Sequence, residues 1–242
     1  MKLTKLTKLT KLANLTKLTK NKFIHNSIPF NKYQNIHFKK SFNNLSKDKY
    51  HVENKNMEYP TRLRKYCNYD VHIDHPENKI EIIHNTNTSF EQNVKDDRKN
   101  IRNFDIIDDY YNPMLLQIMK LSISHTYSFQ KIEKLNVSVH QVRQMVYPNI
   151  SSHNSPEGIH RDGADYIISA FVVDRYNVKD GISKIYDHDK NEIYQTILNE
   201  NEYIFQNDTD LYHYITPIKY CNENNLDNYG YRDIIGIDIQ IL

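Results

Sequence analysis

Three side chains of this chain have the types and the spacing of a metal site: His160, Asp162 and His213. His160 and Asp162 are two residues apart, so on an extended strand both side chains point to one face and can close on one ion. His213 lies about fifty residues later and would supply a third ligand from another element. Two imidazoles and a carboxylate on one face of an octahedron leave three positions open, as in non-haem Fe(II) oxygenases. The pattern therefore indicates a catalytic iron centre.

The His-x-Asp triplet alone is weak evidence for metal binding. The chain contains 12 histidines, so about one such triplet is expected by chance. A second copy, His72-Ile73-Asp74, has no evident third partner, and we interpret it as a solvated loop. On the triplet alone, a surface or structural histidine is the simpler interpretation of His160.

The surroundings of the first triplet favour the metal site. Turn-forming residues bracket it, with Pro156 and Gly158 before it and Gly163 after it. The apolar, partly β-branched run 166–173 follows, which is typical of a strand. His213 lies in a similar stretch, so we expect both parts of the site at strands.

Strand signals dominate the chain from residue 135 onward, at 137–142, 166–173, 183–186, 202–205, 212–218 and 232–241. Several short strands separated by turns indicate a mainly β (α+β) fold, and their number matches a jelly roll whose mouth can hold a ligand. Alternating stretches such as 79–83 indicate further strands. Residues 113–130 have a helical apolar pattern, with Asn112 as the N-cap and Pro113 at the first helical position. We expect this helix to buttress the sheet.

The N-terminal region differs from the rest of the chain in charge and in pattern. Residues 1–47 carry 11 lysines and no Asp, Glu or Arg, which leaves 21 basic and 30 acidic residues downstream. Residues 3–20 repeat Leu-Thr-Lys, and a period of three forms no stable apolar stripe on an α-helix. We therefore expect a low-complexity basic tail and linker over residues 1–59 and one domain over residues 60–242. For the tail, a disordered segment, a mitochondrial presequence and a membrane-surface helix are the alternatives.

Composition excludes several classes of protein. The mildly acidic remainder lacks the basic face of a nucleic-acid-binding protein, so we expect no nucleic-acid partner. Cys67 and Cys221 form neither a disulfide framework nor a zinc pattern, which favours an intracellular, cytoplasmic location. The acid-free N-terminus leaves a mitochondrial location open. The longest apolar run, 167–173, is too short for a transmembrane segment.

Several motifs, taken in order, resemble one enzyme family. They are Val139-His140-Gln141-Val142-Arg143-Gln144, Pro156-Glu157-Gly158-Ile159-His160-Arg161-Asp162-Gly163, Arg175-Tyr176-Asn177-Val178 with Gly181-Ile182-Ser183, His213-Tyr214-Ile215-Thr216-Pro217-Ile218 and Gly230-Tyr231-Arg232-Asp233-Ile234-Ile235. Over about residues 60–242 this set resembles the bacterial 2-oxoglutarate/Fe(II) dioxygenases that include L-isoleucine 4-hydroxylase. Asp180 departs from the pattern, because it stands where the first glycine of a Gly-Gly pair is expected.

The resemblance implies a fold, cofactors and a reaction. The fold would be a double-stranded β-helix of cupin type, with Fe(II) held by His160, Asp162 and His213. 2-Oxoglutarate and O₂ would be co-substrates, giving succinate and CO₂ while a C–H bond is hydroxylated, and we expect ascorbate to stimulate turnover. The implied substrate is a small molecule such as a free L-amino acid. A protein side-chain hydroxylase and a non-catalytic cupin-like binding module are the alternatives.

The far carboxylate of 2-oxoglutarate requires a cation, and a late-strand arginine usually supplies it in related oxygenases. Arg232 is the first candidate, because alternation places it on one face with Ile234 and Gly236, and this face can point into the barrel. An outward ion pair with Asp233 or Asp238 is the alternative.

Two further residues are candidates for ligand binding. Arg143 lies on an otherwise apolar strand and is the candidate for a substrate carboxylate, with a structural ion pair as the alternative. Thr216 is a candidate for a hydrogen bond to the co-substrate, with an ordinary strand threonine as the alternative.

Overall fold

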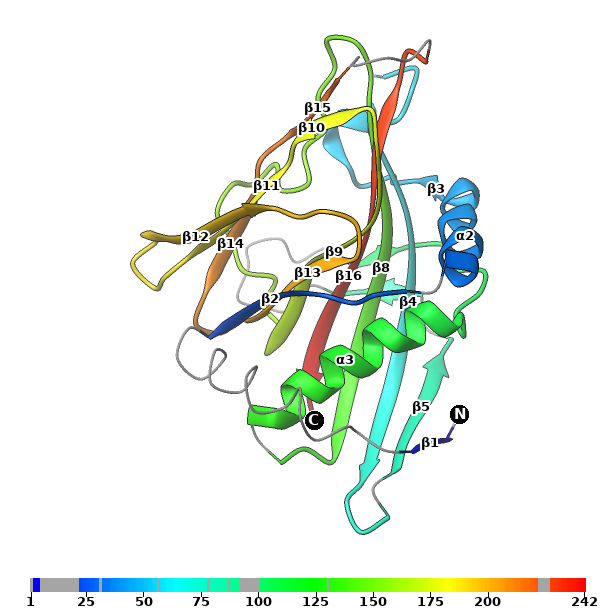
Figure 1. Ribbon diagram of the computed structural model, residues 1–242, viewed down its shortest axis with the longest axis vertical. Helices are drawn as coiled ribbons and strands as arrows, with labels where there is room; N and C mark the ends of the chain where they lie inside the picture. The colour runs from blue at the N-terminus through cyan, green and yellow to red at the C-terminus, as the bar shows by residue number, and fades with distance from the viewer. Residues whose placement is uncertain are drawn as a thin grey trace.

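The computed structural model describes residues 2–4, 22–30, 32–55, 57–77, 79–86, 88–91, 101–129, 131–221 and 227–242. The described chain is mainly β, with one large antiparallel sheet at its centre (Figure 1). This architecture agrees with the predicted jelly roll. Among the described residues, no helix is long and apolar enough to cross a membrane.

The large sheet runs in the order β1-β5-β4-β8-β16-β9-β13-β2, and β3 pairs with β4 at its side. Its strands are β1 (Lys2–Thr4), β2 (Phe23–Ser27), β3 (Ser46–Lys47), β4 (Arg62–Asp74), β5 (Lys79–Asn85), β8 (Lys134–Val146), β9 (Tyr166–Tyr176), β13 (Glu202–Asn207) and β16 (Gly230–Ile241). The C-terminal strand β16 lies between β8 and β9, so residues far apart in the sequence meet at the middle of the sheet.

Smaller sheets complete the β structure. A three-stranded sheet has the order β12-β11-β14, and β10 pairs with β15. Their strands are β10 (Val178–Asp180), β11 (Ile182–Tyr186), β12 (Glu192–Ile197), β14 (Tyr212–Ile215) and β15 (Ile218–Tyr220). β6 (Ser89–Phe90) pairs with β7 (Arg102–Asn103).

Alternation along the central strands divides the interior into two apolar cores. One face of β8 and β16, with Val137, Val139 and Ile237, packs against helix α3 (Pro113–Phe129). The other face, with Val142 and Ile234, packs against the small sheet. Period-two patterning therefore places one set of side chains against the helices and the next set toward the space between the sheets.

Helix α3 forms where the sequence predicts it. The side-chain oxygen of Asn112 accepts a hydrogen bond from the backbone N–H of Met114 at 2.9 Å, which caps the helix, and Pro113 begins it. Met114, Leu115 and nearby apolar residues are buried in the core shared with the sheet. The expected buttressing role is confirmed.

The expected tail and linker over residues 1–59 differs from the structure. β2 pairs with β13 and buries Ile24, while α2 (Lys32–Ser41) and the 3₁₀ turn Phe42–Asn44 bury Phe38 and Phe42. A second 3₁₀ turn, Val52–Lys55, follows and begins at the cavity wall. These segments before residue 60 pack against the sheet, and the sequence does not reveal them because their apolar residues are too sparse to form a recognisable stripe. β1 pairs with β5. The remainder of residues 1–21 lies outside the described residues, so the predicted disorder or targeting role of this segment stays a prediction.

Three local predictions also differ. The His72-Ile73-Asp74 triplet, predicted as a solvated loop, forms the end of strand β4, although His72 itself is exposed. Strand β12 has no counterpart among the predicted strands. The predicted strand 212–218 is divided at Thr216 and Pro217 into β14 and β15. Asp180 has a left-handed φ of 63°, the conformation for which a glycine was expected, and Asp tolerates it better than most residues.

Candidate functional site

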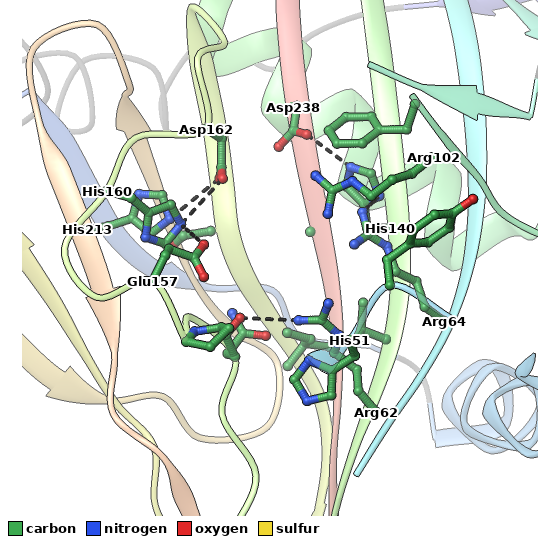
Figure 2. Close-up of a pocket in the computed structure, with 18 of the residues that line it drawn as sticks. His51, Arg62, Arg64, Arg102, His140, Glu157, His160, Asp162, His213 and Asp238 are labelled. Carbon is green, nitrogen blue, oxygen red and sulfur yellow. Dashed lines mark hydrogen bonds and ion pairs between the residues drawn. The ribbon is translucent and has the colours of Figure 1, made fainter. Parts of the chain in front are cut away.

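The structure brings His160, Asp162 and His213 together. One ligand atom from each residue lies within 4.8 Å of the others. Asp162 contacts both imidazoles, with Oδ1 3.5 Å from His160 Nε2 and Oδ2 3.5 Å from His213 Nε2. Figure 2 shows the three side chains pointing toward one another at one side of a pocket. Two imidazole nitrogens and a carboxylate form a donor set that fits Fe(II).

Backbone hydrogen bonds fix the two histidines side by side. His213 lies on β14 and His160 in the loop before β9, and each backbone N–H donates to the other's carbonyl, at 3.1 and 2.9 Å. Gly158 and Gly163 flank the triplet with φ of 84°, a conformation that favours glycine. The His-x-Asp segment is thus an extended loop anchored by one bridge, and not the regular strand we expected.

Local contacts orient the ligand atoms and set their charge. His160 Nδ1 lies 2.8 Å from the carbonyl of Gly158, so it carries the hydrogen and Nε2 faces Asp162. Burial lowers the pKa of His160, but the carboxylates of Asp162 and Glu157 outweigh it and raise the pKa to about 9. Burial opposes ionisation of Asp162, yet the imidazoles of His213 and His160 hold its pKa well below the usual value. An ionised carboxylate between two imidazoles suits a divalent cation, whose binding to His160 releases the proton on Nε2.

Asp208 lies beside His213 and was not assigned a role from the sequence. Its Oδ1 is 3.7 Å from His213 Nδ1, and its Oδ2 accepts a hydrogen bond from the Gly163 backbone at 2.8 Å. Burial and the charge of Asp162 raise the pKa of Asp208 to about 8. The distance is that of an ion pair and is longer than a hydrogen bond. A carboxyl group beside the imidazole of a metal ligand commonly orients it. The only sequence signal for this role of Asp208 was its position in the turn before strand β14.

A cavity of about 440 Å³ opens beside the three residues. Its lining includes carboxylates near the histidines and three arginines from β4 and β7, namely Arg62, Arg64 and Arg102. Figure 2 shows the arginines on the side of the pocket opposite His160, Asp162 and His213. Alternation along β4 places Arg62 and Arg64 on one face, but only the fold brings Arg102 of β7 beside them and this face opposite the histidines, so sequence reasoning missed the basic wall.

A chain of side-chain contacts crosses the basic wall. Arg64 Nη2 lies 2.5 Å from His140 Nδ1, and His140 Nε2 lies 3.0 Å from Asp238 Oδ2. Because a guanidinium only donates, Nδ1 accepts and Nε2–H donates to Asp238. Burial, and then the charge of Arg64, keeps the pKa of His140 well below its usual value, so the imidazole is neutral. Burial and the charge of Asp162 raise the pKa of Asp238 well above its usual value.

Arg232 is fully buried on the same face of β16 as Ile234 and Gly236, as alternation predicts, and those two residues line the cavity. Its Nε and Nη2 donate to Gln144 Oε1 at 2.9 and 2.6 Å, and Nη1 donates to the Gly181 carbonyl at 3.2 Å. Arg232 itself is not among the residues that line the cavity. A methyl group on Gly181 would lie 2.7 Å from Arg232 Nη1, so a glycine is needed there.

Thr216 and Arg143, the other two candidates for ligand binding, do not line the cavity either. Thr216 Oγ1 accepts a hydrogen bond from the Ile182 backbone at 2.8 Å. Arg143 lies on the helix-facing side of β8 and forms a bidentate ion pair with buried Asp233, with both distances 2.7 Å. The prediction that Arg143 binds a substrate carboxylate is therefore not supported, and the structural ion pair is what the fold contains. Successive residues of a strand point to opposite faces, so Val142 lines the cavity whereas Arg143 points to the helices.

Comparison with known proteins decides the family. The model of the 2OG-Fe dioxygenase family matches residues 39–238. The chain belongs to the 2OG-Fe dioxygenase family. This dioxygenase is therefore an oxidoreductase that uses Fe(II), 2-oxoglutarate and O₂. The match begins within α2, which agrees with the structured region ahead of residue 60. No curated protein sequence matches the chain.

Solved structures share the fold of this dioxygenase over nearly the whole chain. IDO from Bacillus thuringiensis has a TM-score of 0.75 at 16% identity, covering 99% of this chain and 98% of that one. A bsmA homolog from Methylobium petroleophilum PM1 has a TM-score of 0.79 at 14% identity, covering 96% and 93%. The Fe(II)/(alpha)ketoglutarate-dependent dioxygenase TqaL has a TM-score of 0.68 at 13% identity, covering 96% and 87%. These likenesses establish the fold.

Proposed function

We propose that this dioxygenase hydroxylates a C–H bond of a free amino acid or a similar small molecule, with His160, Asp162 and His213 holding the Fe(II). The observation that carries the proposal is the convergence of these residues on one cavity of about 440 Å³. Small-molecule sites typically enclose about 300–1,000 Å³. Groups of both charge signs line the cavity, including Glu157 and Arg64, which suits a zwitterion.

The residues of the chain have separate tasks in this scheme. When bound, the iron and 2-oxoglutarate supply the oxidative chemistry that converts 2-oxoglutarate and O₂ to succinate and CO₂ and leaves one oxygen atom on the substrate carbon. His160 presents Nε2 because Nδ1 is held by the Gly158 carbonyl. Asp162 supplies the anionic ligand, and Asp208 orients His213. Three protein ligands leave three positions for the co-substrates.

Arg232 is proposed to bind the far carboxylate of 2-oxoglutarate. It is a fully buried cation whose hydrogen-bond partners in the described structure, Gln144 and Gly181, are neutral acceptors. Burial lowers the pKa of Arg232 to about 9, so it stays charged at neutral pH. A buried charge without an opposite charge is costly, and an anionic ligand would offset that cost. Thr216, in the segment after β14, is proposed to assist through its hydroxyl group.

The proposal is tested by succinate release from 2-oxoglutarate with Fe(II) and ascorbate, in the presence of each of the twenty L-amino acids, isoleucine included. At least one amino acid should raise succinate release above the level without substrate, and mass spectrometry should find the product 16 mass units heavier, the mass of one oxygen atom. His213→Ala should abolish iron binding and turnover, because a ligand is lost. His72→Ala removes an exposed histidine of the second triplet and serves as the matched control.

Two results would contradict the proposal. Wild-type iron affinity in His213→Ala would refute the ligand assignment. Hydroxylation of peptides, with no response to any free amino acid, would favour the protein side-chain hydroxylase instead.

A further inference from the structure

The environment of Arg64 differs from that of Arg62 and Arg143, two other arginines on the central strands. Arg62 Nε donates to Asp48 Oδ2 at 2.8 Å, and Arg143 forms its ion pair with Asp233. Arg64 has no such pair: no carboxylate of the described chain lies within 4.0 Å of its guanidinium nitrogens. Its Nη2 contacts the neutral imidazole of His140. Its Nε is buried and has no hydrogen-bond partner in the described part of the structure.

Aromatic rings hold the Arg64 side chain in place. Its Cζ lies 4.2 Å from the ring centroid of Phe104 and 5.7 Å from that of Phe90. The Cζ of Arg102 lies 5.3 Å from the centroid of the same Phe90 ring, so a second cation adjoins the first. Rings around a guanidinium leave its planar N–H edge as the donor surface. That edge belongs to a residue that lines the cavity.

Two acidic groups lie near Arg64, and neither forms an ion pair with it: Asp48 is bonded to Arg62, and Asp238 lies behind His140. Burial lowers the pKa of Arg64 only to about 10, so the guanidinium remains protonated at neutral pH. Asp238 contacts it only through His140, and burial raises the pKa of that carboxyl group. A poorly solvated cation at a cavity wall favours an anionic ligand, because the ligand restores the missing opposite charge.

We infer that Arg64 binds a carboxylate group of the prime substrate, on the cavity wall opposite His160, Asp162 and His213. The inference rests on the proposed function and narrows the substrate class to carboxylic acids whose reacting carbon lies away from the carboxylate. The planar fork of a guanidinium matches the two oxygens of a carboxylate. The co-substrate carboxylate is left to Arg232, which is fully buried on β16 and does not line the cavity, whereas Arg64 lines it.

The matched control for Arg64 is its neighbour on β4. Lys65 points to the other face of the sheet and pairs with Asp108, so Lys65→Met removes the same charge without touching the cavity. Arg64→Met keeps an unbranched side chain between the two phenylalanine rings. Both variants are first compared with the wild type by thermal unfolding without ligand, which shows whether each is folded.

The substrate-independent test measures thermal stabilisation by sodium acetate, acetamide and inorganic phosphate at constant ionic strength. Acetate should raise the melting temperature of wild type and Lys65→Met and should stabilise Arg64→Met much less, with acetamide inactive in all three. Equal acetate stabilisation of wild type and Arg64→Met would overturn the inference. Stabilisation by phosphate alone would replace the carboxylate with a phosphate group as the ligand.

The kinetic test uses each amino acid that supports turnover together with its α-carboxamide. Wild type should prefer the acid, and Arg64→Met should raise the KM for the acid by roughly 30-fold or more, as expected for a lost charge-assisted pair. The KM for 2-oxoglutarate should move far less than the KM for the acid. A larger rise for 2-oxoglutarate would assign Arg64 to the co-substrate and overturn the inference. Absence of any 2-oxoglutarate turnover in wild type would instead refute the proposed function, while acetate binding still tests Arg64.

Discussion

Replacement of Arg232 by leucine tests how this dioxygenase holds its co-substrate. Arg232 is fully buried and donates to Gln144 Oε1 through two nitrogens and to the Gly181 carbonyl through a third. No carboxylate of the described chain forms an ion pair with it, so the far carboxylate of 2-oxoglutarate would be its only anionic partner. The leucine variant removes that pair and leaves the ligands of the iron in place.

The size of the effect follows from burial. Truncating one partner of a buried, hydrogen-bonded charge pair costs about 2–5 kcal/mol, which corresponds to roughly 30-fold or more in affinity. The contact with Gln144 is lost whether or not the co-substrate is bound, so it affects folding stability and largely cancels from the KM for 2-oxoglutarate. Arg232→Lys should recover only part of the affinity, because an ammonium group lacks the planar fork.

The assay is succinate release as a function of 2-oxoglutarate concentration, alongside direct binding of 2-oxoglutarate by calorimetry. Arg143→Leu is the control, because it removes an arginine from the helix-facing side of the same sheet. It should leave the KM for 2-oxoglutarate near the wild-type value. An unchanged KM for 2-oxoglutarate in Arg232→Leu would refute the assignment of Arg232.

Four further predictions follow from the fold and the site. Arg143→Leu should lower the free energy of unfolding by about 3 kcal/mol in urea titrations, because Asp233 is left buried without its partner; no loss would mean that the ion pair is not stabilising. A chain that begins at residue 48 should melt at least about 15 °C lower, because it loses five buried core side chains at about 1.5–3 kcal/mol each. An unchanged melting temperature would show that β2 and α2 are dispensable. Burial lowers the pKa of His125 to about 4, so between about pH 6.5 and pH 4 the unfolded chain binds a proton that the folded chain does not. The free energy of unfolding should therefore fall by up to about 3 kcal/mol as the pH is lowered through this window. The variant His125→Gln should not show this loss. Asp208→Ala should weaken iron binding by about 10–100-fold in a metal titration, and wild-type affinity would remove its positioning role.

The sequence determined much of this protein, because local rules act on neighbouring residues. Period-two patterning predicted most strands after residue 135, and Asn112-Pro113 predicted the start of helix α3. The spacing of His160 and Asp162, with glycines on either side, indicated the site that the structure assembles. Alternation also placed Arg232 on the same face as Ile234 and Gly236.

Tertiary structure alone decided which side chains meet across the cavity and which arginines have partners. Arg143 faces the helices and pairs with Asp233, while Arg64 lines the cavity and forms no ion pair with a carboxylate of the described chain, although both lie on strands of the same sheet. The buried segments near residues 24 and 38 likewise depend on a sheet edge and a core that form from distant parts of the chain. Local patterns give the face of a residue relative to its own strand, but the partners on that face come from strand order and register. Strand order and register depend on contacts between residues far apart in the sequence, so no local sequence pattern specifies them.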